Sequence, residues 1–203
     1  MKLGPKFKIA RRLGAPIFEK TQTAKFKASL ENQAPKKGKR PGQKSDYGKQ
    51  LIEKQKARFT YGISERQFSR YVRNVIESKS HTQAPDLFIK LETRLDNTIY
   101  RLALVPTRQM ARQTVSHGHI LINGRKLNVP SYVVKIGDVI SIRTGSKTNA
   151  IFKEIDEKMK SAGIPSWLTW DIAKKEATVL RLPSSEGQDM LFDLSAVLEF
   201  YKR

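Results

Sequence analysis

The first notable absence from this sequence is cysteine: none of its 203 residues is one. Without cysteine the chain can form no disulfide, no thiolate nucleophile and no cysteine-ligated zinc site. It also has no apolar run near the roughly 20 residues that a membrane-spanning helix needs. Its first residues, MKLGPKFKIARRLG, lack the apolar stretch of about 7–15 residues found in secretory signals. We therefore expect a soluble, cytoplasmic protein with no membrane partner.

Acidic residues are scarce, since 19 aspartates and glutamates face 39 lysines and arginines, for a net charge of +20. An excess of this size destabilises a folded chain through self-repulsion unless a polyanion offsets it. Nucleic acid and an anionic membrane are the candidate partners. Residues 1–45 alone hold 13 basic and 2 acidic residues, a net charge of +11, which is over half of the excess.

The same first 45 residues are rich in lysine, glycine and proline. The run APKKGKRPGQKS, residues 34–45, has too much glycine, proline and charge for a helix. We expect residues 1–45 to form an extended basic arm that becomes ordered against a partner, with a flexible solubilising tail as the alternative. The candidate RNA contacts in this arm are Arg11, Arg12, Lys36, Lys37, Arg40 and Lys44.

Residues 46–91 have the apolar spacing of a helical body. A first helix, which carries Lys54 and Arg58, is expected to end near Gly62. The sequence SERQ at 64–67 matches a capping box, and apolar residues then recur at helical spacing from Phe68 to Ile76. The remaining surface of this second helix carries three candidate RNA contacts, for which a solvated face is at least as good an explanation: Arg66, Arg70 and Arg73.

Residues 92–163 read as a separate module. Two short helices are expected, one with Leu95 on its apolar face and one beginning after Thr107 as N-cap, with Val105-Pro106 between them. Asn123-Gly124 then predicts a β-hairpin, because both turn positions favour positive φ. Further strands are expected near Val133 and at 139–143, and part of 152–159 is expected to be helical.

Residues 164–203 combine strand and helix patterns. Residues 164–171 and 177–182 alternate like strands, and the last ten residues, LSAVLEFYKR, read as a short helix. The predicted fold class is therefore α+β: a basic arm (1–45), a mainly helical segment (46–91), a module of two short helices and a small antiparallel sheet (92–163), and a C-terminal segment (164–203) whose helix must pack on another element.

The stretch TRQMARQTVSHGHILINGRKL, residues 107–127, contains no acid. Arginine binds phosphate in bidentate fashion and stacks on bases, so this stretch predicts a site for folded RNA that is recognised by shape and backbone. The candidate contacts of the module are Arg94, Arg101, Arg108, Arg112, His117, Arg125 and Lys126. Glu92 and Asp96 are expected to pair with Arg94 and Arg101 rather than to act as catalytic acids.

Two sharper interpretations are disfavoured. GKRPGQKS, residues 38–45, resembles a phosphate-binding loop, but its glycine spacing is wrong and no apolar strand precedes it. His117 and His119 could suggest a metal pair, but no third ligand type is near in sequence. We expect no metal, no cofactor and no catalytic residue.

Residues 94–143 closely resemble an RNA-binding module named after the fourth small-subunit ribosomal protein. The resemblance rests on RLDN at 94–97, TRQMARQTVSH at 107–117, INGR at 122–125 and GDVISI at 137–142. LGPKFKIARRLG, SDYGKQLIEKQKARFTYGISERQFSRY and PSWLTWD extend it to the bacterial ribosomal protein family itself, with residues 20–33 and 183–194 the weakest part.

This resemblance implies a mainly helical domain, formed by residues 46–91 and completed by 164–203, with the module (92–163) inserted as a second domain. It further implies a primary binder of small-subunit (16S) ribosomal RNA that attaches early in subunit assembly. It also implies contact with the third and fifth small-subunit proteins, a place where mRNA enters the 30S subunit, and an influence on decoding accuracy. Arg40 and Lys44 lie in the matching basic stretch. Some relatives hold zinc through cysteines in the arm, a site that this chain cannot form.

We therefore expect a structural RNA-binding protein and not an enzyme. Three rivals remain: an RNA-modifying enzyme that carries the same module, a translational repressor that acts off the ribosome, and a cationic DNA or membrane binder. The first would need a catalytic domain of about 150 residues that this chain has no room for. A density gradient at high salt would separate the second from a ribosomal protein.

Overall fold

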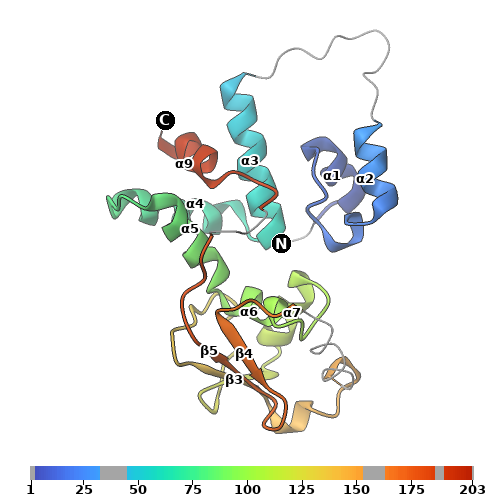
Figure 1. Cartoon of the computed structure of the whole chain (residues 1–203), viewed down its shortest axis with the longest axis vertical. Helices are drawn as coiled ribbons and strands as arrows, with labels where there is room; N and C mark the ends of the chain where they lie inside the picture. Colours follow the sequence, from blue (N-terminus) through green and yellow to red (C-terminus); the bar gives the residue numbers. More distant parts are fainter. Residues whose placement is uncertain (1–2, 33–44, 153–162, 186–189, 203) are drawn as a thin grey trace. The chain divides into compact units, whose positions relative to one another are not determined.

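The computed structural model describes residues 3–32, 45–152, 163–185 and 190–202. The chain divides into two compact units, which Figure 1 shows in sequence colours. Unit 1 comprises Met1–Leu87 and Gly187–Arg203, and unit 2 comprises Phe88–Glu186. Within the described ranges, no helix has both the length and the apolar character needed to cross a membrane.

Unit 1 begins with α1 (Lys6–Leu13), the 3-10 turn η1 (Glu19–Thr21) and α2 (Ala24–Glu31). This corrects the expectation of an extended arm for residues 3–32. Leu13, Ile17, Phe18 and Phe26 bury their side chains together with Phe59 of the next helix, and Phe18 and Phe59 meet edge to face at 6.3 Å. The few apolar positions therefore suffice for a small core. Residues 34–44, also predicted to be extended, lie outside the described ranges.

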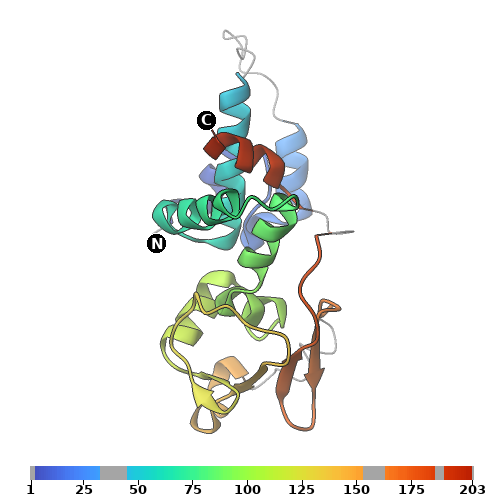
Figure 2. The same cartoon turned by 90° about the vertical axis from the view of Figure 1, so that its left-hand side faces the viewer.

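Helices α3 (Asp46–Tyr61), α4 (Glu65–Glu77) and α9 (Leu194–Lys202) also belong to unit 1. As predicted, α3 ends at Gly62, whose φ of 62° is left-handed, and Ser64 caps α4 by accepting a hydrogen bond from the Gln67 N–H. The buried residues Phe68, Val72 and Val75 fall on one face of α4. Helix α9 packs on α3 and α4, as Figures 1 and 2 show.

Side chains from α3, α4 and α9 meet around Lys54. This lysine is 7% exposed, donates to Glu65 at 2.8 Å and lies 4.5 Å from the centre of the Phe200 ring. Tyr201 donates to the same Glu65 oxygen at 2.8 Å. Partial burial alone would raise the pKa of Glu65, but the bonds from Lys54 and Tyr201 and the charges of Lys54 and Arg58 lower it below its usual value.

Unit 2 begins within α5 (Gln83–Glu92), which is followed by α6 (Leu95–Arg101) and α7 (Arg108–Ser116). Thr107 caps α7 as predicted, accepting a bond from the Met110 N–H at 3.2 Å. The first N–H groups of α6 are satisfied from a later loop: Leu95 donates to Tyr132 and Asp96 to Pro130. The start of α6 is therefore fixed by residues more than 30 positions away in the sequence.

The sheet of unit 2 contains β1 (Ile120–Ile122), β2 (Arg125–Lys126), β3 (Val139–Ile142), β4 (Leu168–Asp171) and β5 (Glu176–Val179). The strand order is β2-β1-β3-β5-β4 and every pairing is antiparallel. Asn123 and Gly124 form the predicted hairpin turn, with φ of 50° and 77°. Near Val133, where a strand was expected, the structure has only an isolated bridge to Arg94. The short turns η2 (Thr144–Ser146) and η3 (Ala150–Phe152) follow β3.

One face of this sheet packs on α6 and α7. Ile120, Ile122, Ile140 and Ala177 bury their side chains against residues of the two helices such as Leu95. Because β5 pairs with β3 and β4 pairs with β5, residues 164–185 belong to unit 2. The predicted assignment of this segment to the helical body differs from the structure. Of the described residues in the C-terminal segment, 190–202 lie in unit 1. The helix expected within 152–159 falls mostly outside the described residues.

Candidate nucleic-acid interface

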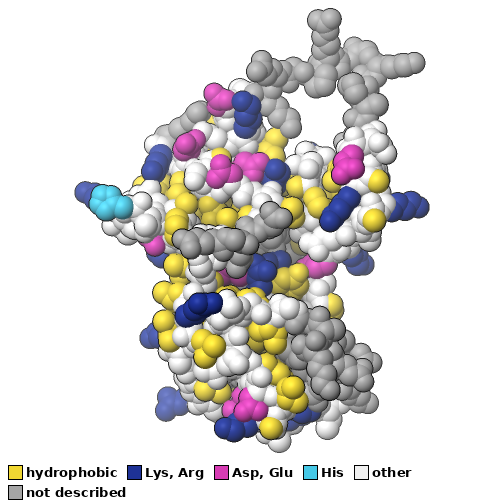
Figure 3. Space-filling view, in the orientation of Figure 1, with side chains coloured by type: hydrophobic (Ala, Val, Ile, Leu, Met, Phe, Trp, Pro, Cys, Tyr) yellow, Lys and Arg dark blue, Asp and Glu magenta, His cyan; other side chains and the backbone are white. Residues whose placement is uncertain are grey.

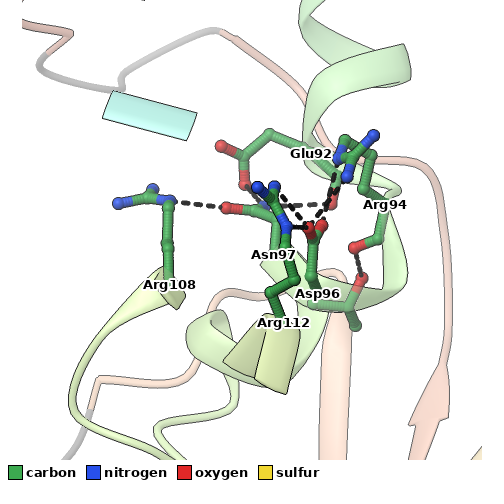
Figure 4. A network of polar contacts seen from close by, with 7 residues as sticks. Glu92, Arg94, Asp96, Asn97, Arg108 and Arg112 are labelled. Atoms are coloured by element: carbon green, nitrogen blue, oxygen red, sulfur yellow. Dashed lines mark hydrogen bonds and ion pairs between the residues drawn. The ribbon is translucent and has the colours of Figure 1, made fainter. Parts of the chain in front are cut away.

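Helices α6 and α7 are joined by a polar network around Asp96, drawn in Figure 4. Asp96, whose side chain is 4% exposed, accepts bonds from Arg94 at 2.8 Å and from Arg112 at 2.7 Å. The Arg94 side chain is 2% exposed, whereas that of Arg112 is 28% exposed. The carboxylate therefore neutralises one buried guanidinium and orients a second that reaches the surface.

Glu92 organises the neighbouring arginine in the same way. Its side chain is fully buried and accepts two bonds from Arg101, at 2.7 and 2.8 Å. Asn97 donates to both the backbone and the side chain of Glu92. The pairing of Glu92 and Asp96 with Arg101 and Arg94 confirms the sequence expectation.

Arg108, at the first position of α7, completes the cluster. Its Nε donates to Asn97 Oδ1 at 2.9 Å, and its guanidinium lies 4.2 Å from the centre of the Tyr100 ring. Arg101, Arg108 and Arg112 are thus held by short contacts to α6 or its flank, and each remains partly exposed. Guanidiniums fixed in this way lose less conformational entropy on binding phosphate than mobile ones would.

Two predicted contacts are structural instead. Arg94 is 1% exposed, and Lys54 is 7% exposed within the α3–α4–α9 contact. Buried charges of this kind are retained because a partner compensates them, here Asp96 and Glu65. The structure corrects the sequence expectation for both residues, because neither side chain can reach a large partner.

Arg58 is intermediate between these groups. It donates to Gln55 at 2.8 Å, lies 3.4 Å from Glu65 and stacks over Phe59 with its guanidinium 4.3 Å from the ring centre. Its side chain is 15% exposed. These contacts hold Arg58 against α3, so only a small part of it can meet a partner.

The remaining described candidates are exposed. Arg66, Arg70 and Arg73 lie on α4 at spacings of four and three residues, which places them on one helix face. The other exposed candidates are Arg11 and Arg12 on α1, His117 after α7, and Arg125 and Lys126 on β2. Lys36, Lys37, Arg40 and Lys44 lie outside the described residues. In the face of unit 1 drawn in Figure 3, acidic side chains lie among the lysines and arginines.

Sequence reasoning missed the part played by Asn97, which bridges Glu92 and Arg108. The sequence did contain a sign of this role. Asn97 lies in the first turn of a predicted helix, from which an asparagine side chain can reach the residues that precede the helix. Among the described residues, no group of three or more histidine, aspartate and glutamate side chains is arranged to hold a metal ion.

The chain resembles known proteins over nearly its whole length. Residues 2–92 match the family described as "Ribosomal protein S4/S9 N-terminal domain", and residues 93–140 match the family described as "S4 domain". The small ribosomal subunit protein uS4 of Roseiflexus sp. (strain RS-1) is 42% identical over 202 residues, which cover 98% of each chain. The protein of the same name from Variovorax paradoxus (strain S110) is 40% identical over 204 residues, covering 99% of this chain and 98% of that one.

Proposed function

Because the chain belongs to the uS4 family of small ribosomal subunit proteins, we propose that it binds 16S rRNA directly and nucleates assembly of the subunit around that contact. The observation that carries the proposal is the match to small-subunit proteins over 98% of the chain. The structure adds a physical route: Arg101, Arg108 and Arg112 are oriented by α6 and partly exposed. Guanidiniums presented in this way suit backbone phosphates.

Titration of a 16S rRNA 5′-domain transcript with the full-length protein, over a series of salt concentrations and with excess unrelated structured RNA, tests the proposal. Specific sites in nucleic-acid complexes exceed non-specific ones by on the order of a thousandfold or more. A margin of that size supports a primary rRNA binder. Equal affinity for both RNAs would show a generic polycation, and the proposal would be dropped.

The arginines of α7 give a sharper test. We predict that Arg108→Ala combined with Arg112→Ala weakens transcript binding and reduces its salt dependence by about two phosphate contacts, because each contact releases counterions. The chain should stay folded, since Arg94 still compensates Asp96. The matched control replaces two exposed lysines of unit 2, Lys135 and Lys174, by alanine. If the arginine variant bound the transcript as tightly as this control at moderate salt, Arg108 and Arg112 would not be RNA contacts.

We further propose that the protein, together with the third and fifth small-subunit proteins, lines the path by which mRNA enters the 30S subunit and influences decoding accuracy. Family membership alone supports this part, because Arg40 and Lys44 lie outside the described residues. Relative to wild-type subunits, subunits that carry Arg40→Gln with Lys44→Gln should lose more of their translation rate on a messenger with a stable 5′ hairpin than on an unstructured one. Equal losses on the two messengers would contradict this role for the two residues.

A further inference from the structure

A second basic cluster lies on the sheet of unit 2, at the far end of α7 from Arg108. Lys126 of β2 pairs with Leu121 of β1, and Leu121 pairs with Ser141 of β3. Side chains two residues apart along a strand share a face, so His119 and Arg143 lie on the same face as Leu121, Lys126 and Ser141. The Arg143 N–H donates to the His119 carbonyl at 2.9 Å, which continues the ladder. This is the face opposite to the one that packs on α6 and α7.

The turn after β3 folds back onto this face. Ser146 Oγ lies 2.9 Å from His119 Nδ1, and the Ser146 N–H donates to the Arg143 carbonyl at 2.8 Å. The His119 ring also meets Phe152 edge to face at 6.2 Å. These contacts attach η2 to the sheet, and the exposed residues Arg143 and Lys147 flank this turn in the sequence.

The Lys126 side chain packs over a glycine. A methyl group on Gly118 would come within 2.2 Å of Lys126 Cε and 3.1 Å of Nζ, so the lysine side chain lies directly over the Gly118 backbone. Gly118 also has a left-handed φ of 71°, which other residues rarely adopt. The Lys126 side chain therefore lies over the turn that follows α7.

Charge is distributed unevenly across this open face. Residues 116–127 and 141–149 contain Arg125, Lys126, Arg143 and Lys147 but no aspartate or glutamate. Along the same row of side chains, Glu176 of β5 pairs with Ser141, and Asp171 of β4 pairs with Glu176. Asp138, just before β3, is buried and accepts a hydrogen bond from the Asn123 side chain at the hairpin turn. One row of side chains thus runs from a cationic edge at β2 to an acidic edge at β4, so a polyanion is attracted to the β2–β1–β3 side.

We propose that Lys126, Arg143 and Lys147, arranged around His119, form a second contact surface for the phosphates of the same RNA; the proposal rests on the rRNA binding proposed above. Arg143 and Lys147 are its new members, and both lie beyond the residues 93–140 matched by the module's family. The nine residues of α7 separate this surface from Arg108, a span of roughly 13 Å at about 1.5 Å per residue. One folded RNA can contact both ends of the helix.

The affinity test uses the full-length chain with Arg143→Gln and Lys147→Gln together. The control, Lys135→Gln with Lys174→Gln, removes the same charge from exposed positions elsewhere on unit 2. We expect the first variant to bind the 16S 5′-domain transcript at least about tenfold more weakly than the control, with a salt dependence reduced by one to two phosphate contacts. Equal affinity and equal salt dependence for the two variants would overturn the proposal. If the wild-type protein bound the 16S transcript no more tightly than unrelated structured RNA, the proposed function would be wrong, and this proposal would fail with it.

A contact test uses the natural lack of cysteine, which makes an introduced thiol unique. Lys147→Cys and, as control, Lys174→Cys are each joined to an iron chelate that cleaves nearby RNA. Cleavage of the bound transcript at defined nucleotides from position 147, and none from position 174, is the expected result. The absence of cleavage from position 147 in a complex of full affinity would mean that this face looks away from the RNA and is left for another partner, such as an acidic protein, and would overturn the proposal.

Discussion

Asp96 joins two arginines in opposite surroundings, because Arg94 is buried and Arg112 reaches the surface. The negative charge of Asp96 therefore stabilises the fold by compensating Arg94, and it also positions Arg112 at the candidate interface. This coupling explains why a count of basic residues overestimates the binding surface: Arg94 and Lys54 add to the net charge, but both are buried and paired with acids of the same chain.

We predict that Asp96→Asn lowers the free energy of unfolding by about 3–5 kcal/mol, because the guanidinium of Arg94 loses its buried counter-charge. Urea denaturation followed by circular dichroism measures the change. Asp46→Asn is the control: Asp46 pairs with Lys49 at 3.1 Å, but the two side chains are 79% and 60% exposed, and exposed pairs contribute little. A loss for Asp96→Asn as small as that of the control would mean that Arg94 finds sufficient compensation elsewhere.

Local signals were predictable from the sequence wherever one residue decides the conformation. Thr107 and Ser64 cap their helices and Asn123-Gly124 turns the hairpin, as expected. Which arginine is buried was not predictable, because that depends on the loop after β2, whose Pro130 and Tyr132 carbonyls hold the start of α6 in place. Contacts between positions so far apart in the sequence leave no local pattern.

At the scale of elements, the junction of α3, α4 and α9 depends on the charge of one carboxylate. Glu65 receives hydrogen bonds from Lys54 on α3 and Tyr201 on α9. Its pKa is lowered in the folded state. Its charged form therefore contributes stability above the pKa of an unfolded glutamate, near 4.3, and this contribution is lost as the pH falls through the folded-state pKa.

We predict that Glu65→Gln destabilises the chain at pH 7 but differs less from the wild type at pH 3. That pH lies below the pKa of an unfolded glutamate, so part of the stability contributed by the charged carboxylate is already lost there. Chemical denaturation at the two pH values gives the comparison. For Glu77→Gln, at an exposed position near the end of α4, the difference in stability from the wild type should be the same at pH 7 and pH 3. If the Glu65→Gln deficit were the same at both pH values, the charge of Glu65 would not be what stabilises the junction.

Elements of the first 32 residues show the limit of composition as a guide. Their glycine, proline and lysine content predicted an extended arm, yet α1 and α2 form and bury Leu13, Phe18 and Phe26. The cover comes in part from Phe59 on α3. A few apolar residues are sufficient to fold these helices when another helix supplies the rest of the core. The contact with α3 could not be predicted from the sequence of residues 3–32 alone.

At the scale of the whole molecule, the strands β4 and β5 show a second limit. Their alternation predicted strands correctly, but not the partner, because pairing with β3 across about 35 residues is a matter of topology. The sheet is the reason that unit 2 extends to Glu186. Family membership could be recognised from short motifs, whereas the domain boundary required the pairing.

We predict that residues 83–186, expressed alone, fold and unfold cooperatively, because unit 2 has its own core of buried side chains from Leu95 to Val179. Residues 1–87 alone should lack a cooperative transition, since α9 is missing from α3 and α4. Thermal melts by circular dichroism distinguish the two fragments. A disordered 83–186 fragment would show that unit 2 depends on the rest of the chain.

Unit 1 is assembled from both ends of the chain, and this has a consequence during biosynthesis. Phe200 and Tyr201 will cover Lys54 in the folded protein. Neither residue has been synthesised when α3 and α4 leave the translating ribosome. About 120 more residues must follow, which takes roughly 6–24 seconds at about 5–20 residues per second. Unit 2 is completed within this interval. The half of the chain that is begun first is therefore finished last, and its buried lysine stays uncovered until the final helix arrives.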